Sequence, residues 1–198
     1  MKNLVISKST YKPLKPEWAP TLFRIKPAFE FYLETLNPVI SDYYSYGRTG
    51  IHGLDTHTTA VVFRGIDCAL HLGCEPMPVV FACALHDVAR ANDEFDTDHG
   101  KNAIPIAIKV MKQFPNLMDK ETRLKVLSAI RNHTDGCFAP DYISACLWDA
   151  DRVRMSWQYG FDEKFFNTER GKYIAQHYQK YLDYQRHEFS NIKWSKQY

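Results

Sequence analysis

Apolar residues along the chain recur mainly at helical spacing, and the strict alternation that indicates β-strands is absent. The segment 57–72 carries an apolar stripe made of Val61, Val62, Ile66, Ala69 and Leu70. The segment 79–85 is apolar on every side, which predicts a central, buried helix. The same pattern predicts helices at residues 18–36, 57–72, 76–90, 99–114, 119–133, 140–157 and 167–189. The fold class predicted from these segments is an all-α bundle.

Proline and glycine positions support these boundaries. Pro76 and Pro78 suit the first turn of a helix, whereas Pro105 predicts a bend within one. Residues 1–17, interrupted by Pro13 and Pro16, predict an extended lead-in. The remainder, residues 18–198, shows no internal boundary or repeat and is predicted to form a single all-α domain.

Composition excludes several classes of function. The chain of 198 residues is 45% hydrophobic and 24% charged, with a net charge of +2 and dispersed basic residues, so it predicts no nucleic-acid polymer as partner. No apolar run approaches the roughly 18 residues of a membrane span, and the N-terminal residues do not resemble a signal peptide. The five cysteines form no CxxC pair, which favours buried free thiols and a cytoplasmic location.

Two groups that are costly to bury stand at the end of the most apolar segment. His86 and Asp87 follow directly on the run that ends at Leu85. An unpaired buried carboxylate costs several kcal/mol, and a divalent cation is one partner that offsets this cost. His57 begins the preceding long helix, and Asp151 lies on a later one, so a compact bundle would bring these groups together. The sequence therefore predicts a metal site of two histidines and two aspartates.

In this order, His57, His86-Asp87 and Asp151 resemble the H…HD…D signature of the HD-domain superfamily of metal-dependent phosphohydrolases. The segments ALHDVAR and ADRV are similar to the family's motifs, and the resemblance covers about residues 57–155. It implies a compact helical bundle with a metal at its centre, held by these four residues, and hydrolysis of phosphate esters.

Two positions leave alternatives open. His52 also precedes the first long helix, but it lies in a glycine-rich stretch, whereas His57 stands at the helix start with the family's usual spacing to His86. Asp149 competes with Asp151, and the match to the family motif favours Asp151. We then expect Asp149 to orient a ligand or an arginine.

His99 and His133 decide how many ions bind. Some members of the superfamily have two further histidines between the HD pair and the last aspartate, and these members hold two metals bridged by the HD aspartate. The chain has the same order, so His99 and His133 are candidates for a second metal or for substrate contact. Alternatively, they only begin and end their helices.

Basic residues near the motifs are candidates for phosphate binding. Arg90 lies about one helical turn after His86 and Asp87, and it is predicted to meet the substrate phosphate as a catalytic residue together with Asp87. Further candidates for phosphate contact are Lys101, Arg152 and Arg154.

The function expected from this resemblance is hydrolysis of a small phosphorylated metabolite or nucleotide by metal-activated water. One or two ions of Fe, Mn, Co, Ni or Zn suit a site of histidine and aspartate. Two alternatives stay open, namely a di-iron oxygenase that uses all six ligands and a non-catalytic metal-binding sensor. The sequence identifies neither the substrate nor the oligomeric state, and a homo-oligomer is compatible with it.

Overall fold

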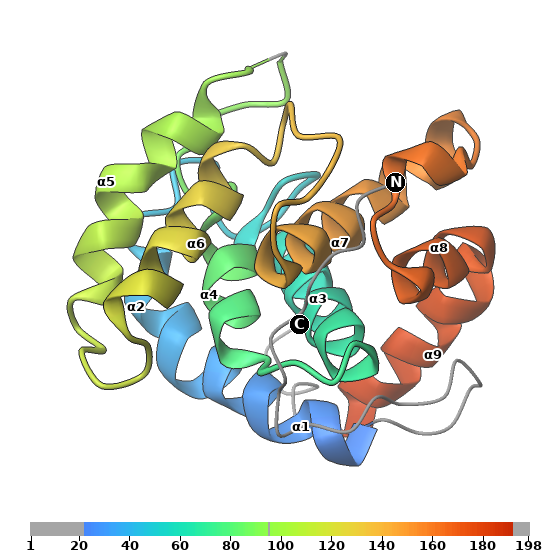
Figure 1. Ribbon diagram of the computed structural model, residues 1–198, viewed down its shortest axis with the longest axis horizontal. Coiled ribbons are helices and arrows are strands. Elements are labelled where there is room, and N and C mark those ends of the chain that lie inside the picture. Colours follow the sequence, from blue (N-terminus) through green and yellow to red (C-terminus); the bar gives the residue numbers. More distant parts are fainter. Residues whose placement is uncertain (1–21, 95, 192–198) are drawn as a thin grey trace.

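The computed structural model describes residues 22–94 and 96–191, and these form an all-helical fold (Figure 1). The predicted fold class is confirmed, because no described residue belongs to a β-strand. The lead-in predicted for residues 1–17 lies outside the described residues. Among the described helices, none is both long and apolar enough to cross a membrane.

The described residues form nine α-helices and three shorter helical turns. The α-helices are α1 (Leu22–Phe31), α2 (Asn37–Ser41), α3 (Thr59–His71), α4 (Met77–Leu85), α5 (His99–Met111), α6 (Lys120–Arg131), α7 (Tyr142–Tyr159), α8 (Glu169–Gln176) and α9 (Tyr178–Asn191). Two turns are π-helical, η1 (Tyr32–Leu36) and η2 (Leu54–Thr58), and one is a 3₁₀-helix, η3 (Glu163–Phe165).

Helices α3, α4 and α7 pack against one another at the centre of the fold. Helices α5 and α6 pair on one side of this centre, and α8 and α9 lie on the other side (Figure 1). Helix α1 packs across one end of α3 and α4. The central helices therefore have neighbours on several sides, which suits them to hold a buried site.

Helix α4 is buried on every side, as its sequence predicts. Each residue from Val79 to Leu85 is fully buried. The helix ends at Leu85, however, and not near Arg90 as expected, because residues 86–89 form turns. His86 caps the helix with α-helical backbone angles, φ −60° and ψ −41°, and Asp87 lies in the turn that follows.

Other predicted helices differ from the observed ones in length and continuity. The helix expected at 18–36 continues to Ser41 in its described part, interrupted by the π-turn η1. Pro38 follows this turn and has no N–H group to continue the regular ladder, which accounts for the change of register. The helix expected at 167–189 is divided at His177 into α8 and α9, and neither glycine nor proline marks this break in the sequence.

A buried ion pair attaches the last two helices to the centre. Asp67 on α3 is fully buried and accepts hydrogen bonds from Arg170 Nε (3.0 Å) and Nη2 (2.9 Å) on α8. Tyr181 on α9 donates its hydroxyl to the same carboxylate oxygen at 2.8 Å, and His71 Nδ1 lies 3.0 Å from the other. One carboxylate on α3 therefore joins this helix to α8 and α9, which are distant from it in sequence.

Replacing Arg170 by methionine should destabilise the fold by about 3–5 kcal/mol near neutral pH, because it leaves the Asp67 carboxylate buried without its cation. Chemical denaturation would measure this loss. Lys172→Met is the matched control, since Lys172 forms surface pairs with Glu163 and Glu169 and should cost at most about 1 kcal/mol. Equal losses in the two variants would contradict the assignment.

The ion pair of Asp67 and Arg170 also predicts how the stability of the fold depends on pH. Burial would raise the pKa of Asp67, but His71, Arg170 and Tyr181 outweigh it, so the pKa lies below its ordinary value. The stabilisation is therefore complete above the unfolded-state pKa of about 3.9 and is lost as the pH falls through the folded-state value. Denaturation of wild type and Arg170→Met should give a stability difference that narrows below about pH 4.

Candidate metal centre

His57 is presented by the π-turn η2, directly before α3. Gly53 precedes this turn in an extended conformation, and the Thr59 N–H bonds back to Leu54 O and Thr56 O. Arg48 Nε and Nη2 hold Asp55 through two hydrogen bonds of 2.7 and 2.8 Å, which fixes the turn to the preceding loop. Single π-turns often occur at functional sites, since they alter the direction of one side chain within a helix.

His86 and Asp87 lie in the turn that follows α4. His86 is fully buried, and its Nδ1 donates to Cys83 O at 2.8 Å, which leaves Nε2 as the nitrogen available to bind a ligand. Gly65 on α3 allows the close approach of α4, because a Cβ atom at this position would lie 2.5 Å from Cys83 Sγ. Helix α4, which ends directly before His86, is therefore in direct contact with α3, which begins directly after the turn that carries His57.

Four residues make up the first donor group, namely His57, His86, Asp151 and Asp87, the last through its Oδ2 atom. The His57 and His86 Nε2 atoms are 3.3 Å apart, and Asp151 Oδ1 lies 3.0 and 3.7 Å from them. Asp87 Oδ2 lies 3.6 Å from His57 Nε2 and 3.3 Å from His86 Nε2. Helices α3, α4 and α7 thus bring the four predicted residues together, and they could hold a metal ion.

The second donor group consists of His99, His133 and the Oδ1 atom of Asp87. His99 Nε2 and His133 Nε2 lie 2.8 Å apart, at 3.1 and 3.7 Å from Asp87 Oδ1. The His133 Nδ1 donates to Ile130 O at 2.7 Å, and the His99 Nδ1 contacts Asp96 O. Gly100 permits the approach of α5 to α6, because a Cβ there would lie 2.7 Å from Ile130 O. The two carboxylate oxygens of Asp87 therefore face different pairs of histidines.

The charges in this centre depend on one another. Burial alone would lower the pKa of His86, but Asp87 and Asp151 outweigh it and raise this pKa to about 10. Burial would raise the pKa of both aspartates, but His86 and the neighbouring histidines hold both values well below the ordinary range. The pKa of His57 is lowered, mainly by burial. Two carboxylates are thus anionic in a buried place, and a proton on His86 supplies positive charge there.

The chemistry of these donors fits a divalent cation. Imidazole nitrogen and carboxylate oxygen are the common ligands of Zn²⁺, Fe²⁺ and Mn²⁺, and the backbone bonds of His86 and His133 fix their tautomers as ligating histidines require. The side chain of Asp151 is 21% exposed, whereas that of Asp87 is 3% exposed. The centre therefore opens to solvent on the side of Asp151.

His52, which the sequence left as an alternative to His57, also reaches the centre. Its Nδ1 lies 3.1 Å from Asp87 Oδ2, and its Nε2 lies 3.7 Å from Asp93 Oδ1. Tyr46 donates its hydroxyl to Asp93 Oδ2 at 2.9 Å. His52, His57 and Asp87 also form a group that could hold a metal. The spacing of five residues to His57, with the extended Gly53 between them, is the signal that both histidines reach one place.

The predicted basic residues are occupied with local contacts. Arg90 donates from Nε to Asn92 O and from Nη2 to Glu94 O, both at 3.1 Å, and its Nη1 lies 3.3 Å from His99 Nδ1. Lys101 is exposed and pairs with Asp98 at 2.6 Å. Of these two basic residues, Arg90 is the nearer to the donor groups, and it lies at the edge of the second donor group beside His99.

Two predicted residues on α7 contact the loops that follow α6 and α7. Arg152 donates to backbone oxygens of Phe165, His133 and Gly136. Asp149 is fully buried and accepts bonds of 2.7–3.1 Å from the backbone and side chains of Asn167 and Thr168. Burial raises the pKa of Asp149. Its observed hydrogen bonds join α7 to the start of α8, and the expected bond to a metal-ligand candidate or an arginine is not among them.

We expect the chelator-treated protein to bind two Mn²⁺ ions and to release protons as it does so, because His86 is protonated in the metal-free centre and a ligating imidazole is neutral. Since its pKa is about 10, the affinity should rise between about pH 6 and pH 8. Isothermal titration calorimetry in buffers of different ionisation enthalpy would measure stoichiometry and proton release.

Single substitutions should separate the two donor groups. His133→Ala should bind one Mn²⁺ ion, and Asp87→Ala should weaken both positions, because only Asp87 contributes an oxygen to each. His177→Ala is the control, since His177 is exposed between α8 and α9 and belongs to neither donor group. Two ions bound to His133→Ala, or unchanged binding by Asp87→Ala, would contradict this assignment.

Comparison with known proteins places the fold. No family model matches the sequence, and no curated protein does. The chain is similar to a crystal structure from an uncultured Thermotogales bacterium, described as a predicted HD superfamily hydrolase, with a TM-score of 0.52 and 20% sequence identity. The similarity covers 86% of this chain and 90% of that one. At this identity the likeness establishes the fold alone, and the chain therefore has an HD-like helical fold.

Proposed function

We propose that the protein is a metal-dependent phosphohydrolase that acts on a small phosphorylated metabolite or nucleotide. The observation that carries this proposal is the convergence of four histidines, His57, His86, His99 and His133, on the buried Asp87 carboxylate. Asp151 lies beside His57 and His86 and completes the order H…HD…H…H…D. The fold shared with a predicted HD superfamily hydrolase supports the same reaction class. Fold alone does not define an activity, so the donor set is the stronger argument.

His57, His86, Asp87 and Asp151 would hold one ion in the proposed enzyme, and His99 and His133 would hold a second with Asp87. A divalent cation, when bound, supplies Lewis acidity toward a phosphoryl oxygen and lowers the pKa of a water ligand. Histidine and aspartate accept Fe, Mn, Co, Ni and Zn, so metal availability would decide among these.

The residues of the chain have separate tasks in this proposal. Asp87 accepts hydrogen bonds or ligates through both oxygens, which fixes the spacing between the two donor groups. Arg90, the proposed phosphate contact, lies at the edge of the second group and would neutralise charge that develops on phosphate oxygens. Its bonds to Asn92 and Glu94 would hold the guanidinium in place beforehand. His52, 22% exposed beside Asp87, would border the incoming substrate.

Purified protein loaded with Mn²⁺, Co²⁺, Ni²⁺ or Fe²⁺ should release phosphate from at least one member of a panel of phosphate monoesters and nucleotides. Asp87→Ala should lose this activity, because the substitution removes a donor from both groups. Phosphate release would be measured with the wild type and with His177→Ala as a control of unchanged activity. A wild type no faster than Asp87→Ala with every metal and ester would sink the proposal.

The six-residue donor set also favours a second candidate, a di-iron oxygenase. Asp87 presents one oxygen to each pair of histidines, and a carboxylate in this position can bridge two irons. Anaerobically iron-loaded protein would then consume O₂ in the presence of its substrate and give the EPR signal of a mixed-valence pair. Phosphate release without either property would favour the hydrolase. Metal-dependent thermal stability without any turnover would favour the sensor.

A further inference from the structure

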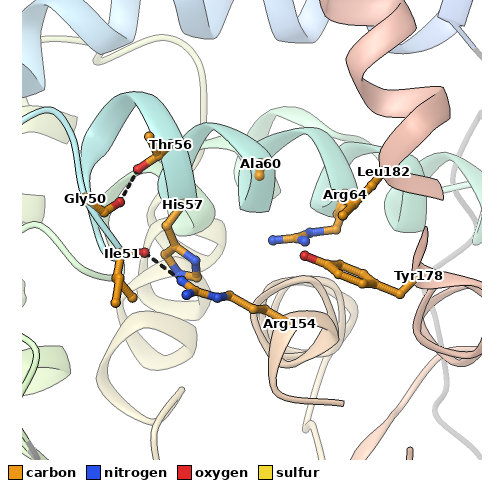
Figure 2. Close-up of a pocket in the computed structure, with 9 residues that line it drawn as sticks. All are labelled: Gly50, Ile51, Thr56, His57, Ala60, Arg64, Arg154, Tyr178 and Leu182. Carbon is orange, nitrogen blue, oxygen red and sulfur yellow. Dashed lines mark hydrogen bonds between the residues drawn. The ribbon is translucent and has the colours of Figure 1, made fainter. Parts of the chain in front are cut away.

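A cavity of about 380 Å³ adjoins the candidate metal centre on the side of His57 (Figure 2). We call it the Arg64 pocket, and its walls come from η2, from the loop before it, and from α3, α7 and α9. The lining residues are Gly50, Ile51, Thr56, His57, Ala60, Arg64, Arg154, Tyr178 and Leu182. None of these lining residues is acidic, while two are arginines. The size suits a small molecule, and the lining suits an anionic one.

Arg64 is the unusual member of this lining. It is only 2% exposed, yet no ion pair or hydrogen bond joins it to any residue in the described part of the chain. Its Nε is buried without a hydrogen-bond partner. A guanidinium stays protonated under physiological conditions, and burying this charge without a partner costs several kcal/mol. Such a residue is costly to the fold unless something outside the described chain pairs with it.

The polar side chains of Arg64, Arg154 and Tyr178 point toward the side of the pocket where His57 lies (Figure 2). His57, Ala60 and Arg64 follow at intervals of three and four residues, which places them on one face of the helix. Figure 2 shows the side chains of Arg64, Arg154 and Tyr178 extending from three different helices toward the side where His57 lies. Arg154 Nη1 donates to Ile51 O at 3.0 Å, which uses one of its five N–H groups and orients the others.

The distance along the helix sets the size of the ligand. Seven residues separate His57 from Arg64, which is about 10 Å along the helix axis. Long helical side chains lean toward the N-terminus, so the guanidinium lies nearer to His57 than its Cα does. One small molecule can therefore extend from the donor groups to Arg64.

We propose that the Arg64 pocket is an anion-binding subsite that recognises a second anionic group, a carboxylate or a phosphate, on the substrate of the metal centre. The substrate class is then a phosphate monoester with two anionic ends. Arg64 and Arg154 hold the second anion with charged hydrogen bonds, and the Tyr178 hydroxyl donates a further one. This assignment of substrate class rests on the proposed function, whereas the binding of an anion does not.

Binding to the metal-free protein tests the subsite independently of turnover. Inorganic phosphate titrated calorimetrically into chelator-treated protein should bind the wild type, and Arg64→Met and Arg154→Gln should each weaken binding by roughly 10-fold to 100-fold, as expected for loss of a charged hydrogen bond. Lys112→Gln is the control, because Lys112 is exposed at the end of α5 and should bind as wild type does. No binding by wild type, or binding as tight as that of wild type by both arginine variants, overturns the subsite.

Two milder variants keep the test valid if Arg64→Met fails to fold. Arg64→Lys retains the charge but loses the planar fork, and Tyr178→Phe removes only a hydroxyl. Both should weaken phosphate binding, and circular dichroism would verify their folding. Unchanged binding by both folded variants overturns the subsite as well.

The substrate class is tested with a matched pair of esters. D-Glycerol 3-phosphate and D-3-phosphoglycerate share their configuration at the central carbon and differ only at the far carbon, which is a hydroxymethyl group in one and a carboxylate in the other. Metal-loaded wild type should prefer the carboxylate by roughly 10-fold or more in kcat/KM, and Arg64→Lys and Arg154→Gln should lose this preference. Hydrolysis with no such preference in the wild type overturns the assignment and leaves the proposed function intact. Arginine-dependent phosphate binding without any hydrolysis supports the subsite and refutes the proposed function.

Discussion

Asp87 is almost wholly buried, and a carboxylate removed from water needs positive charge or hydrogen-bond donors on each side. The structure meets this need with histidines from two directions, one set facing each carboxylate oxygen. In the metal-free state His86 carries a proton in response to the aspartates. A divalent cation would supply the same positive charge at a fixed position. The cost of burying this one anion thus accounts for the identity of the groups that surround it.

The helices are arranged to keep this cluster dense. Gly65 lets α3 contact α4, and Gly100 lets α5 contact α6, at the helix pairs from which the histidines project. A methyl group at either position would meet a sulfur or a backbone oxygen at less than 3 Å, which would push the paired helices apart. The π-turn η2 contributes locally, because it presents His57 directly before α3, and the end of α4 places His86 and Asp87 side by side at the same centre.

The sequence predicts the elements and the donor set well because both depend on local pattern and on chemical type. Apolar periodicity identified the central helices, and the order of histidines and aspartates identified the residues that come together. Helix ends were less predictable, since α4 ends at Leu85 although the sequence pattern predicts a helix that extends to residue 90. The hydrogen-bond partners of Asp149 and the burial of Arg64 were not predicted, for another reason. The partners of a buried charge come from loops and helices that are distant in sequence, so a local pattern does not identify them. The position of Arg64 between Phe63 and Gly65 in an apolar helix was nevertheless a signal in the sequence that this arginine is buried.

The attachment of α8 and α9 through Asp67 has a consequence for how this fold can diversify. All the metal-ligand candidates lie between His52 and Asp151, that is, between the loop before η2 and helix α7. One wall of the Arg64 pocket, in contrast, is supplied by Tyr178 and Leu182 of α9. Reactivity and selectivity would then reside in separable parts of the chain. Exchange of the C-terminal helices, with their Arg170 anchor retained, could give new specificities to an unaltered catalytic core.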